Sequence, residues 1–246
     1  VADRVDVAGD MTLGADCWVY PWCHPFDGSY PEFRMKNLYI PATNSGFNAD
    51  AVGWKGGLVL QNGYGIGRGT VARSGAHGGL DGRLASVVYG ESNAPALPGS
   101  GGGGNHYDAG PVTGNGGNGG GMIRLDIGET LIFGGVLYAT GGSYGGSIFS
   151  GGGSGGAVYV TCRRFFGNSN GTIRANGGTG CFGGSQYSGG GGGGRIAVWM
   201  RRDLSESAVA TSVDGGASSP TTTLPGHPGS VVWGTYPPSG SVVLIR

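Results

Sequence analysis

The sequence predicts an all-β protein: a right-handed parallel β-helix, or β-solenoid, with glycine-rich loops and two-strand repeats of about 36 residues. Three observations lead to this fold class. Glycine and proline supply 59 and 12 of the 246 residues, and both disfavour helices. Hydrophobic residues still make up 38% of the chain and charged residues only 12%, so a core can be buried. Short strand-like runs also recur at a nearly constant interval, which is typical of repeat architectures.

The repeat is clearest in residues 119–246. In each unit a glycine run precedes a segment of alternating apolar residues, and the equivalent positions are Ile123, Val158, Ile196 and Val231, spaced by 35, 38 and 35 residues. Alternation with period two is typical of a half-buried strand. A second short run follows in each unit and ends at a Gly-Gly pair, at 136–140, 172–176 and 209–214. We therefore expect equivalent strands to pair in parallel between neighbouring repeats.

The rest of the chain follows the repeat less closely. We interpret residues 1–57 as degenerate repeats with an aromatic cap pinned by a disulfide, and 58–118 as a glycine-rich insertion that is either a loop or a degenerate repeat. All three parts are expected to form one continuous domain. Glycines are expected in tight corners, where they adopt positive φ without cost. Long glycine runs are also expected to pack together as extended polyglycine strands, and 203–208 is the one segment expected to form a helical turn.

Three phrases carry a family resemblance: 151–160, 171–178 and 189–198, each a glycine run joined to a short strand. They resemble the glycine-rich β-helical repeats of large secreted and cell-surface proteins from environmental microbes. The likeness covers roughly 119–233 and is fainter in 5–57. The resemblance implies a role as a stalk, an adhesin or part of an extracellular matrix. It thus suggests a location and an architecture, and it does not point to a particular reaction.

The four cysteines are Cys17, Cys23, Cys162 and Cys181. In a neutral chain with few lysines we favour disulfides over a metal site, and four cysteines leave three pairings open. Disulfides imply an oxidising, extracellular setting. Asn170 begins an Asn-Gly-Thr acceptor pattern for N-glycosylation, which is compatible with that setting.

Several functional classes are not expected. Fifteen basic and fifteen acidic residues give a net charge of zero, so nucleic acid is not an expected partner. No apolar run approaches the roughly 20 residues of a membrane span. The nucleophile pattern Gly-x-Ser-x-Gly at Ser143 and Ser154 is expected by chance in so glycine-rich a chain. The histidines lack zinc-site spacing. We therefore predict no catalytic residue, no metal, no cofactor and no enzymatic activity.

Strand periodicity also identifies outward-facing side chains. Arg124 and Asp126 face outward on one repeat, and Tyr159 and Trp199 do so on later repeats. Aromatic faces at such positions are candidates for stacking on sugar rings. Packing beneath the glycine-rich loops is the competing interpretation.

The ends of the chain suggest self-association, because a solenoid exposes an unpaired strand edge at each end. The candidate interface residues are Val5, Val7, Trp18, Trp22, Val242, Val243, Leu244 and Ile245. The predicted function is that of an extracellular structural protein, a subunit of a self-assembling fibre, sheath or surface layer. The alternative is a carbohydrate-binding or adhesin module, and a β-helical polysaccharide lyase is a third, weaker interpretation.

Overall fold

The computed structural model describes residues 2–105, 114–144, 149–181, 188–219 and 224–236. These residues contain strands but no helix, so the predicted all-β class is confirmed. The main sheet has the strand order β1-β4-β6-β8-β11-β14, with β2 also paired to β4. Its strands are β1 (Ala2–Asp6), β2 (Asp10–Thr12), β4 (Tyr30–Ile40), β6 (Met122–Phe133), β8 (Ala157–Gly167), β11 (Arg195–Asp203) and β14 (Ser230–Thr235).

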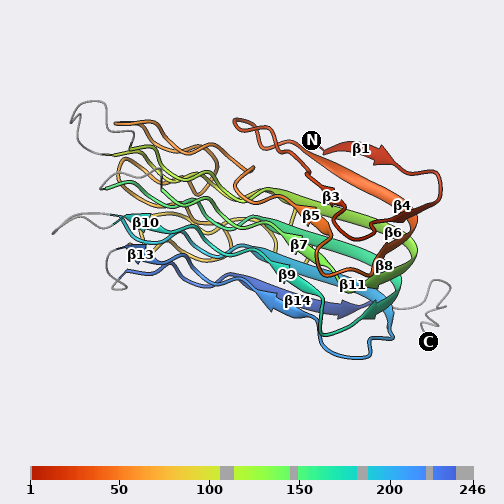
Figure 1. Ribbon diagram of the computed structural model, residues 1–246. Coiled ribbons are helices and arrows are strands. Elements are labelled where there is room, and N and C mark those ends of the chain that lie inside the picture. The colour runs from red at the N-terminus through yellow and green to blue at the C-terminus, as the bar shows by residue number, and fades with distance from the viewer. Residues whose placement is uncertain (1, 106–113, 145–148, 182–187, 220–223, 237–246) are drawn as a thin grey trace, which may run out of the picture.

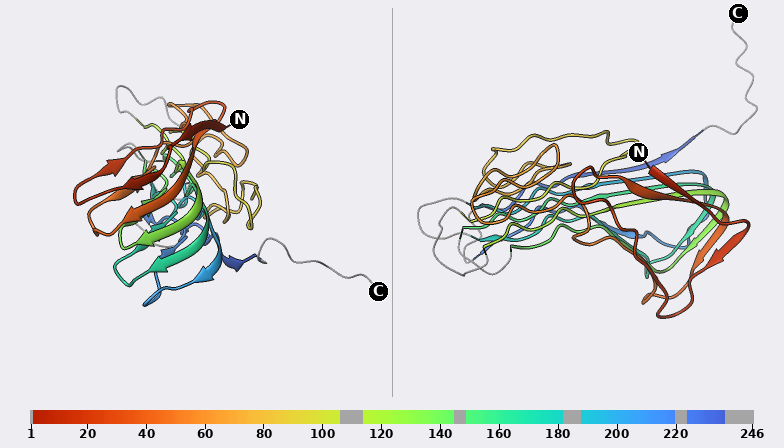
Figure 2. Two further views of the ribbon diagram at one scale, coloured as in Figure 1. Left: turned by 90° about the vertical axis from the view of Figure 1, so that its right-hand side faces the viewer. Right: turned by 90° about the horizontal axis from the view of Figure 1, so that it is seen from above.

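A second sheet faces the first and has the order β12-β9-β7-β5-β3. Its short strands are β3 (Trp18–Val19), β5 (Gly46–Asn48), β7 (Val136–Tyr138), β9 (Thr172–Arg174) and β12 (Ala210–Ser212). A third pair joins β10 (Gly180–Cys181) to β13 (Ser218–Ser219). In the right view of Figure 2, from above, the two larger sheets form a wedge, and in the left view their strands are stacked in rungs from the N-terminal to the C-terminal end.

All strand pairs are parallel, and their register follows the repeat. Ile123 pairs with Val158, Val158 with Ile196, and Ile196 with Val231, as the sequence alignment predicts. The chain alternates between the sheets, because each main-sheet strand from β4 to β11 is followed by a strand of the second sheet. Between the sheets lies one apolar core, which includes Leu38, Phe47, Leu131, Phe133, Phe165 and Ile173.

The other half of the molecule is a glycine bundle (Figure 1). We use this name for the extended segments 53–57, 63–69, 75–82, 99–105, 114–121, 151–156, 177–180, 189–194, 215–217 and 226–229. Most of these residues belong to no sheet, yet their backbone groups are paired. The bundle therefore satisfies its polar groups in some way other than a sheet ladder.

Hydrogen bonds in the bundle repeat every three residues. Gly99 and Gly102 donate to carbonyls of one neighbouring segment, Gly120 and Gly117, at 2.8 and 2.9 Å. Gly101 and Gly104 donate to a second segment, through the carbonyls of Tyr64 and Gln61. Gly103 donates to a third, through Arg73. Three residues per turn is the period of a polyproline II helix, whereas a strand has period two. A glycine segment thus forms hydrogen bonds to neighbours on several sides, whereas a strand in a sheet bonds to neighbours on two sides.

Close packing explains why these positions are glycine. A Cβ atom on Gly119 would overlap the carbonyl of Gly99, and one on Gly190 would overlap that of Gly216. Among the described glycines only four have φ in the left-handed region, namely Gly28, Gly46, Gly65 and Gly90. Tight corners therefore account for few of the described glycines, and most allow the close approach of extended backbones, as expected of the long glycine runs.

Residues 58–105 contain no strand. Parts of this segment belong to the glycine bundle, and others pack against it through backbone hydrogen bonds. A buried polar cluster fixes this segment. The Arg195 guanidinium donates from Nε and Nη2 to the Tyr89 carbonyl, at 3.0 and 2.9 Å. The His77 ring stacks on Tyr89, and its Nδ1 lies 2.9 Å from the Gly155 carbonyl oxygen. Complete burial lowers the pKa of His77 to about 4, so its ring is neutral at physiological pH.

The helical turn expected at 203–208 does not form. The backbone N–H groups of Leu204 and Glu206 donate across to the carbonyls of Phe165 and Gly167 on β8. The Asp203 carboxylate accepts from the Ser205 backbone and hydroxyl, at 3.0 and 2.6 Å. These bonds take the donors that a helical turn would need.

Candidate functional site

The core is open at both ends of the main sheet. Val5, Phe33, Leu125, Val160, Val198 and Trp233 form one column of inward-facing positions across the paired strands. Leu125, Val160 and Val198 are buried, but Val5 and Trp233, at the two ends, are each 40% exposed. Val231 ends a neighbouring column and is 38% exposed, whereas its partner Ile196 is fully buried. Within the described residues, the terminal rungs thus present apolar side chains that a further rung would cover.

The two end strands differ in charge. β1 carries Asp3, Arg4 and Asp6, and the Arg4 guanidinium lies 2.9 Å from the Asp6 carboxylate. β14 has no charged residue. Charged residues on an edge strand discourage pairing with a like edge. Two β1 edges would bring the aspartates of both copies together, so a β1 edge is better matched to a β14 edge.

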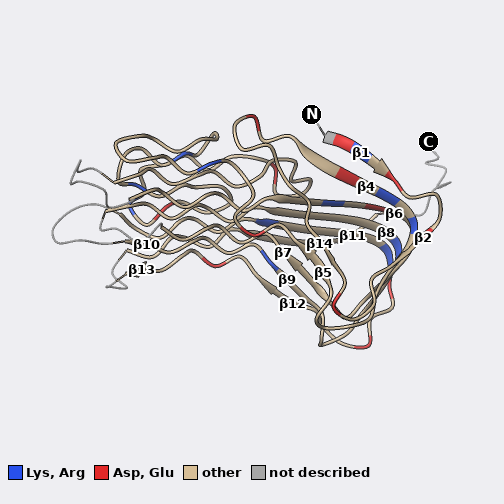
Figure 3. Cartoon of the chain, turned by 45° about the horizontal axis from the view of Figure 1, so that its top comes forward, with Lys and Arg blue, Asp and Glu red and all other residues tan. Residues whose placement is uncertain are grey.

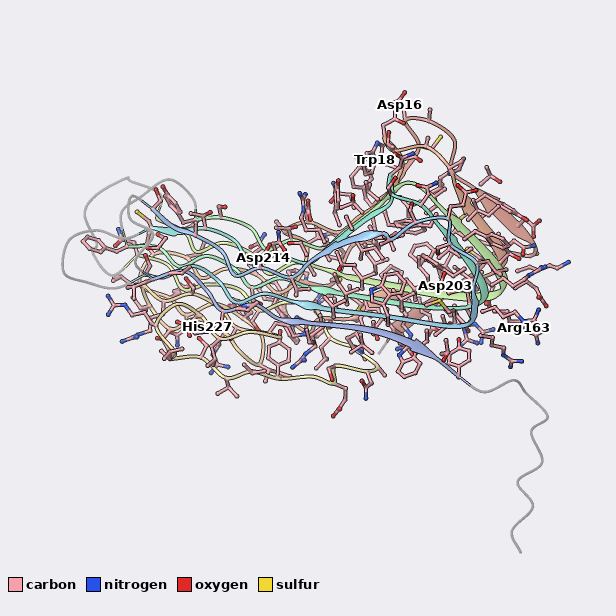
Figure 4. All side chains as sticks on the ribbon, turned by 90° about the horizontal axis from the view of Figure 1, so that it is seen from below. Asp16, Trp18, Arg163, Asp203, Asp214 and His227 are labelled. Atoms are coloured by element: carbon pink, nitrogen blue, oxygen red, sulfur yellow. The ribbon has the colours of Figure 1, made fainter. Side chains whose placement is uncertain are left out.

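The other interface candidates lie in different places. Val7 packs against the core, and its N–H donates to the Arg34 carbonyl. Trp18 is half-buried on β3, the N-terminal edge of the second sheet (Figure 4). Trp22 is 60% exposed and belongs to no strand. The candidates Val242, Val243, Leu244 and Ile245 lie outside the described residues.

The four cysteines are not paired in the structure: all are free thiols. Cys23 packs with Tyr30 and Met122, and Cys162 lies in the main core on β8. Cys17 is exposed, and Cys181 is buried on β10. The expected disulfides are therefore corrected: neither Cys17 and Cys23 nor Cys162 and Cys181, which are neighbours in the sequence, are bonded, and each thiol lies in a different packing environment. The inference of an oxidising compartment loses this support.

Thiol titration tests the correction. Without reductant at pH 8, we expect one thiol, Cys17, to react in the native protein, and all four to react after unfolding. Burial raises the pKa of Cys23 to about 11 and that of Cys162 to about 12, so neither forms a reactive thiolate when folded. Ellman's reagent measures both numbers, and a pre-reduced sample serves as the control. Fewer than four reactive thiols in denaturant would restore the disulfide interpretation.

Tyr159 and Trp199 do not form an open platform. The Arg124 guanidinium lies 5.2 Å from the centre of the half-buried Tyr159 ring. Trp199 stacks on Tyr236, with ring centres 6.1 Å apart and planes at 10°, and its indole N–H donates to the Asn93 carbonyl at 2.7 Å. The sequence places both side chains on the outer face, but neighbouring side chains and a loop cover them. These two residues therefore fit the packing interpretation rather than the sugar-stacking one.

An exposed row of rings lies elsewhere, near the N-terminus. We call Trp22, His24, Phe26 and Tyr64 the aromatic strip. Successive ring centres are 6.1, 6.0 and 4.9 Å apart, and each pair meets edge to face. Hollows of about 380 and 720 Å³ adjoin the two ends of the strip. The larger hollow also presents the polar side chains of Asp27, Gln61, Asn62 and Arg68. The sequence places Trp22 and Phe26 in the expected aromatic cap, but it gives no signal that His24 joins them or that Tyr64, from the insertion, completes the row.

The remaining expectations concern single residues and other site types. Asn170 is exposed in the turn after β8, where the Gly171 N–H donates to the Asn168 carbonyl at 3.0 Å. Among the described residues, no group of three His, Cys, Asp or Glu side chains is arranged to hold a metal ion. The same part of the chain has no long apolar helix able to cross a bilayer. Comparisons with protein-family models, curated proteins and solved structures find no match to this chain.

Proposed function

We propose that this chain is an extracellular structural protein, a non-catalytic subunit that stacks head to tail into a fibre, sheath or surface layer. One observation carries the proposal: the same core column ends in an exposed apolar side chain at both ends, Val5 and Trp233. Stacking β1 of one copy on β14 of the next continues both the parallel pairing and the column. A contact between two different ends does not close on itself, so it extends into a filament.

In this proposal the paired sheets are two faces of a right-handed parallel β-helix, and the glycine bundle replaces the third face. The alternation of the chain between the two sheets supports this assignment. Parallel crossover connections are right-handed in about 98% of cases. The exposed glycosylation pattern at Asn170 supports the extracellular location.

Electron microscopy and light scattering test the proposal on the whole chain. The main sheet stacks six strands in sequence, and strands lie about 4.8 Å apart, so subunits should repeat every ~29 Å along a filament. Reductant should leave the filaments intact, because the thiols are free. Monodisperse monomers at high protein concentration would contradict the proposal.

A second candidate function is glycan binding, which the aromatic strip supports. Exposed rings beside amide and charged side chains are suited to sugars, which offer apolar faces and hydroxyl groups. Trp22 and Phe26 are 60% and 52% exposed, so their rings are accessible.

We expect the double variant Trp22→Ala/Phe26→Ala to lower affinity for a neutral polysaccharide roughly tenfold, since each aromatic contact contributes about 0.5–1.5 kcal/mol. Affinity electrophoresis in hydroxyethylcellulose, galactomannan and dextran gels provides the measurement. Phe166→Ala, an aromatic deletion on β8 outside the strip, is the matched control and should migrate like the wild type. Equal retardation of all three proteins in every gel would argue against a glycan site at the strip.

A further inference from the structure

Four arginines gather where β8 and β11 run side by side. Arg163 and Arg164 are consecutive on β8, and Arg201 and Arg202 are consecutive on β11. Arg164 and Arg202 are direct partners in the parallel register. Figure 3 shows the basic segments of these neighbouring strands close together. We call the four residues the arginine cluster.

The arginine cluster surrounds a hollow of about 300 Å³, and among the described residues its lining is completed by Glu129. Glu129 lies 3.2 Å from Arg163, so that carboxylate is already paired. Asp203 follows Arg202 in the chain, but its carboxylate accepts the two bonds from Ser205. The described lining of this hollow thus holds four guanidinium groups and one carboxylate, in a protein whose net charge is zero.

This arrangement is costly without a counter-ion. Like charges directly opposite one another on paired strands are destabilising. Within the described residues, no carboxylate forms an ion pair with Arg164 or Arg202. On β6 the residue paired with Arg164 is Thr130, so the fold accepts an uncharged side chain at the equivalent position of another strand.

We propose that the arginine cluster binds an oxyanion: a sulfate, phosphate or carboxylate group, either free or carried on an acidic polysaccharide. A guanidinium group donates two parallel hydrogen bonds to such a group, and its charge is permanent. Figure 4 shows Arg163 at the end of the molecule opposite the glycine bundle, and its side chain is 52% exposed, so the hollow is open to solvent there. The hollow is large enough for one oxyanion group and the atoms bonded to it. Duplex nucleic acid, in contrast, requires a longer basic surface. The site lies on the side of the stacked strands, and its binding does not depend on filament formation.

The double variant Arg164→Gln/Arg202→Gln tests the site, and Lys36→Gln/Arg73→Gln is the matched control that removes two basic side chains elsewhere. In biolayer interferometry, we expect the wild type and the control to bind dextran sulfate but not neutral dextran. The cluster variant should bind at least about tenfold more weakly, the effect of losing two charge-assisted contacts. Sulfate stabilises folded proteins in general. The sulfate effect that reports the site is therefore the extra rise in Tm, relative to sodium chloride of equal ionic strength, that the wild type and the control should show over the cluster variant.

The two measurements distinguish the sources of the oxyanion. If sulfate gives the extra rise in Tm but dextran sulfate does not bind, the site takes the free ion. If sulfate gives the extra rise in Tm and dextran sulfate also binds, the site takes an oxyanion carried on a polymer. The cluster variant should also be at least as stable as the wild type without added anion, because the like-charge pair is removed. A lower Tm there would show that the arginines already have an internal partner and would overturn the proposal. Equal dextran sulfate binding by the two double variants, or no response to either anion, would overturn it as well.

Discussion

Replacement of Val5 by lysine is expected to convert filaments into monomers, and so is replacement of Trp233 by lysine. Each change places a charge at the exposed end of the core column, where the proposed neighbour would bury it. A buried charge without a partner costs about 3–5 kcal/mol, so the association constant should fall by two orders of magnitude or more. Sedimentation velocity at matched protein concentration measures the loss of large assemblies.

Mixing the two variants gives the sharper result. Val5→Lys blocks only the N-terminal end, and Trp233→Lys blocks only the C-terminal end. In an equimolar mixture, the free β14 end of the first can pair with the free β1 end of the second. The mixture should therefore form dimers and nothing larger. Among assemblies built from a single type of contact, only head-to-tail pairing predicts monomers for each variant alone and dimers for the mixture.

Val87→Lys is the control for added charge, because Val87 is 65% exposed and lies outside the end strands. Its filaments should resemble those of the wild type. If filaments persist in both single variants, the ends of the core column are not the contact. If the mixture stays monomeric while each variant remains folded, the contact is not head to tail.

Much of the strand register was predictable from the sequence because strands obey a simple period. Alternation fixes which side chains face inward, and a repeat of about 36 residues fixes which positions are equivalent. Together they predict the column from Ile123 to Val231, and the structure has that column. The outward positions of Arg124, Tyr159 and Trp199 follow from the same rule.

The contacts made by those outward residues were not predictable. The partner of the Trp199 indole is Asn93, which lies 106 positions earlier in a segment without a periodic pattern. Cysteine spacing was equally uninformative, because Cys23 and Cys162 serve as small buried apolar groups. The arginine cluster was missed for a different reason. Each Arg-Arg pair is unremarkable alone, and only the register between β8 and β11 brings the two pairs together.

The glycine bundle shows a further limit. A glycine run has no side-chain pattern, so the sequence indicates extended strands but not their period or their partners. The three-residue hydrogen-bond period comes from packing, with each segment surrounded by several others. Ordering so many glycines is entropically costly, since glycine loses more freedom on folding than any other residue. Their backbone hydrogen bonds and close contacts must offset that cost, so a side-chain atom added at one of the closely packed glycines should be destabilising.

Gly119→Ala is therefore expected to lower the free energy of unfolding by about 3 kcal/mol or more. The new Cβ would overlap the backbone carbonyl of Gly99, and a backbone cannot move aside as a flexible side chain can. Moving either segment would also strain the hydrogen bond from the Gly119 N–H to the Trp54 carbonyl, now 2.8 Å. Urea denaturation followed by tryptophan fluorescence measures the change.

Gly14→Ala is the matched control, because a Cβ atom there meets no atom within 4 Å. It should change stability by less than about 0.5 kcal/mol, the range of ordinary surface substitutions. The loss in free energy of unfolding caused by Gly→Ala is thus expected to be at least sixfold larger at Gly119 than at Gly14, since only Gly119 lies between packed backbones. If Gly119→Ala proved as mild as Gly14→Ala, the bundle would be loosely packed. Its glycines would then serve chain flexibility rather than close approach, and the bundle would contribute little to holding the stacked strands in place.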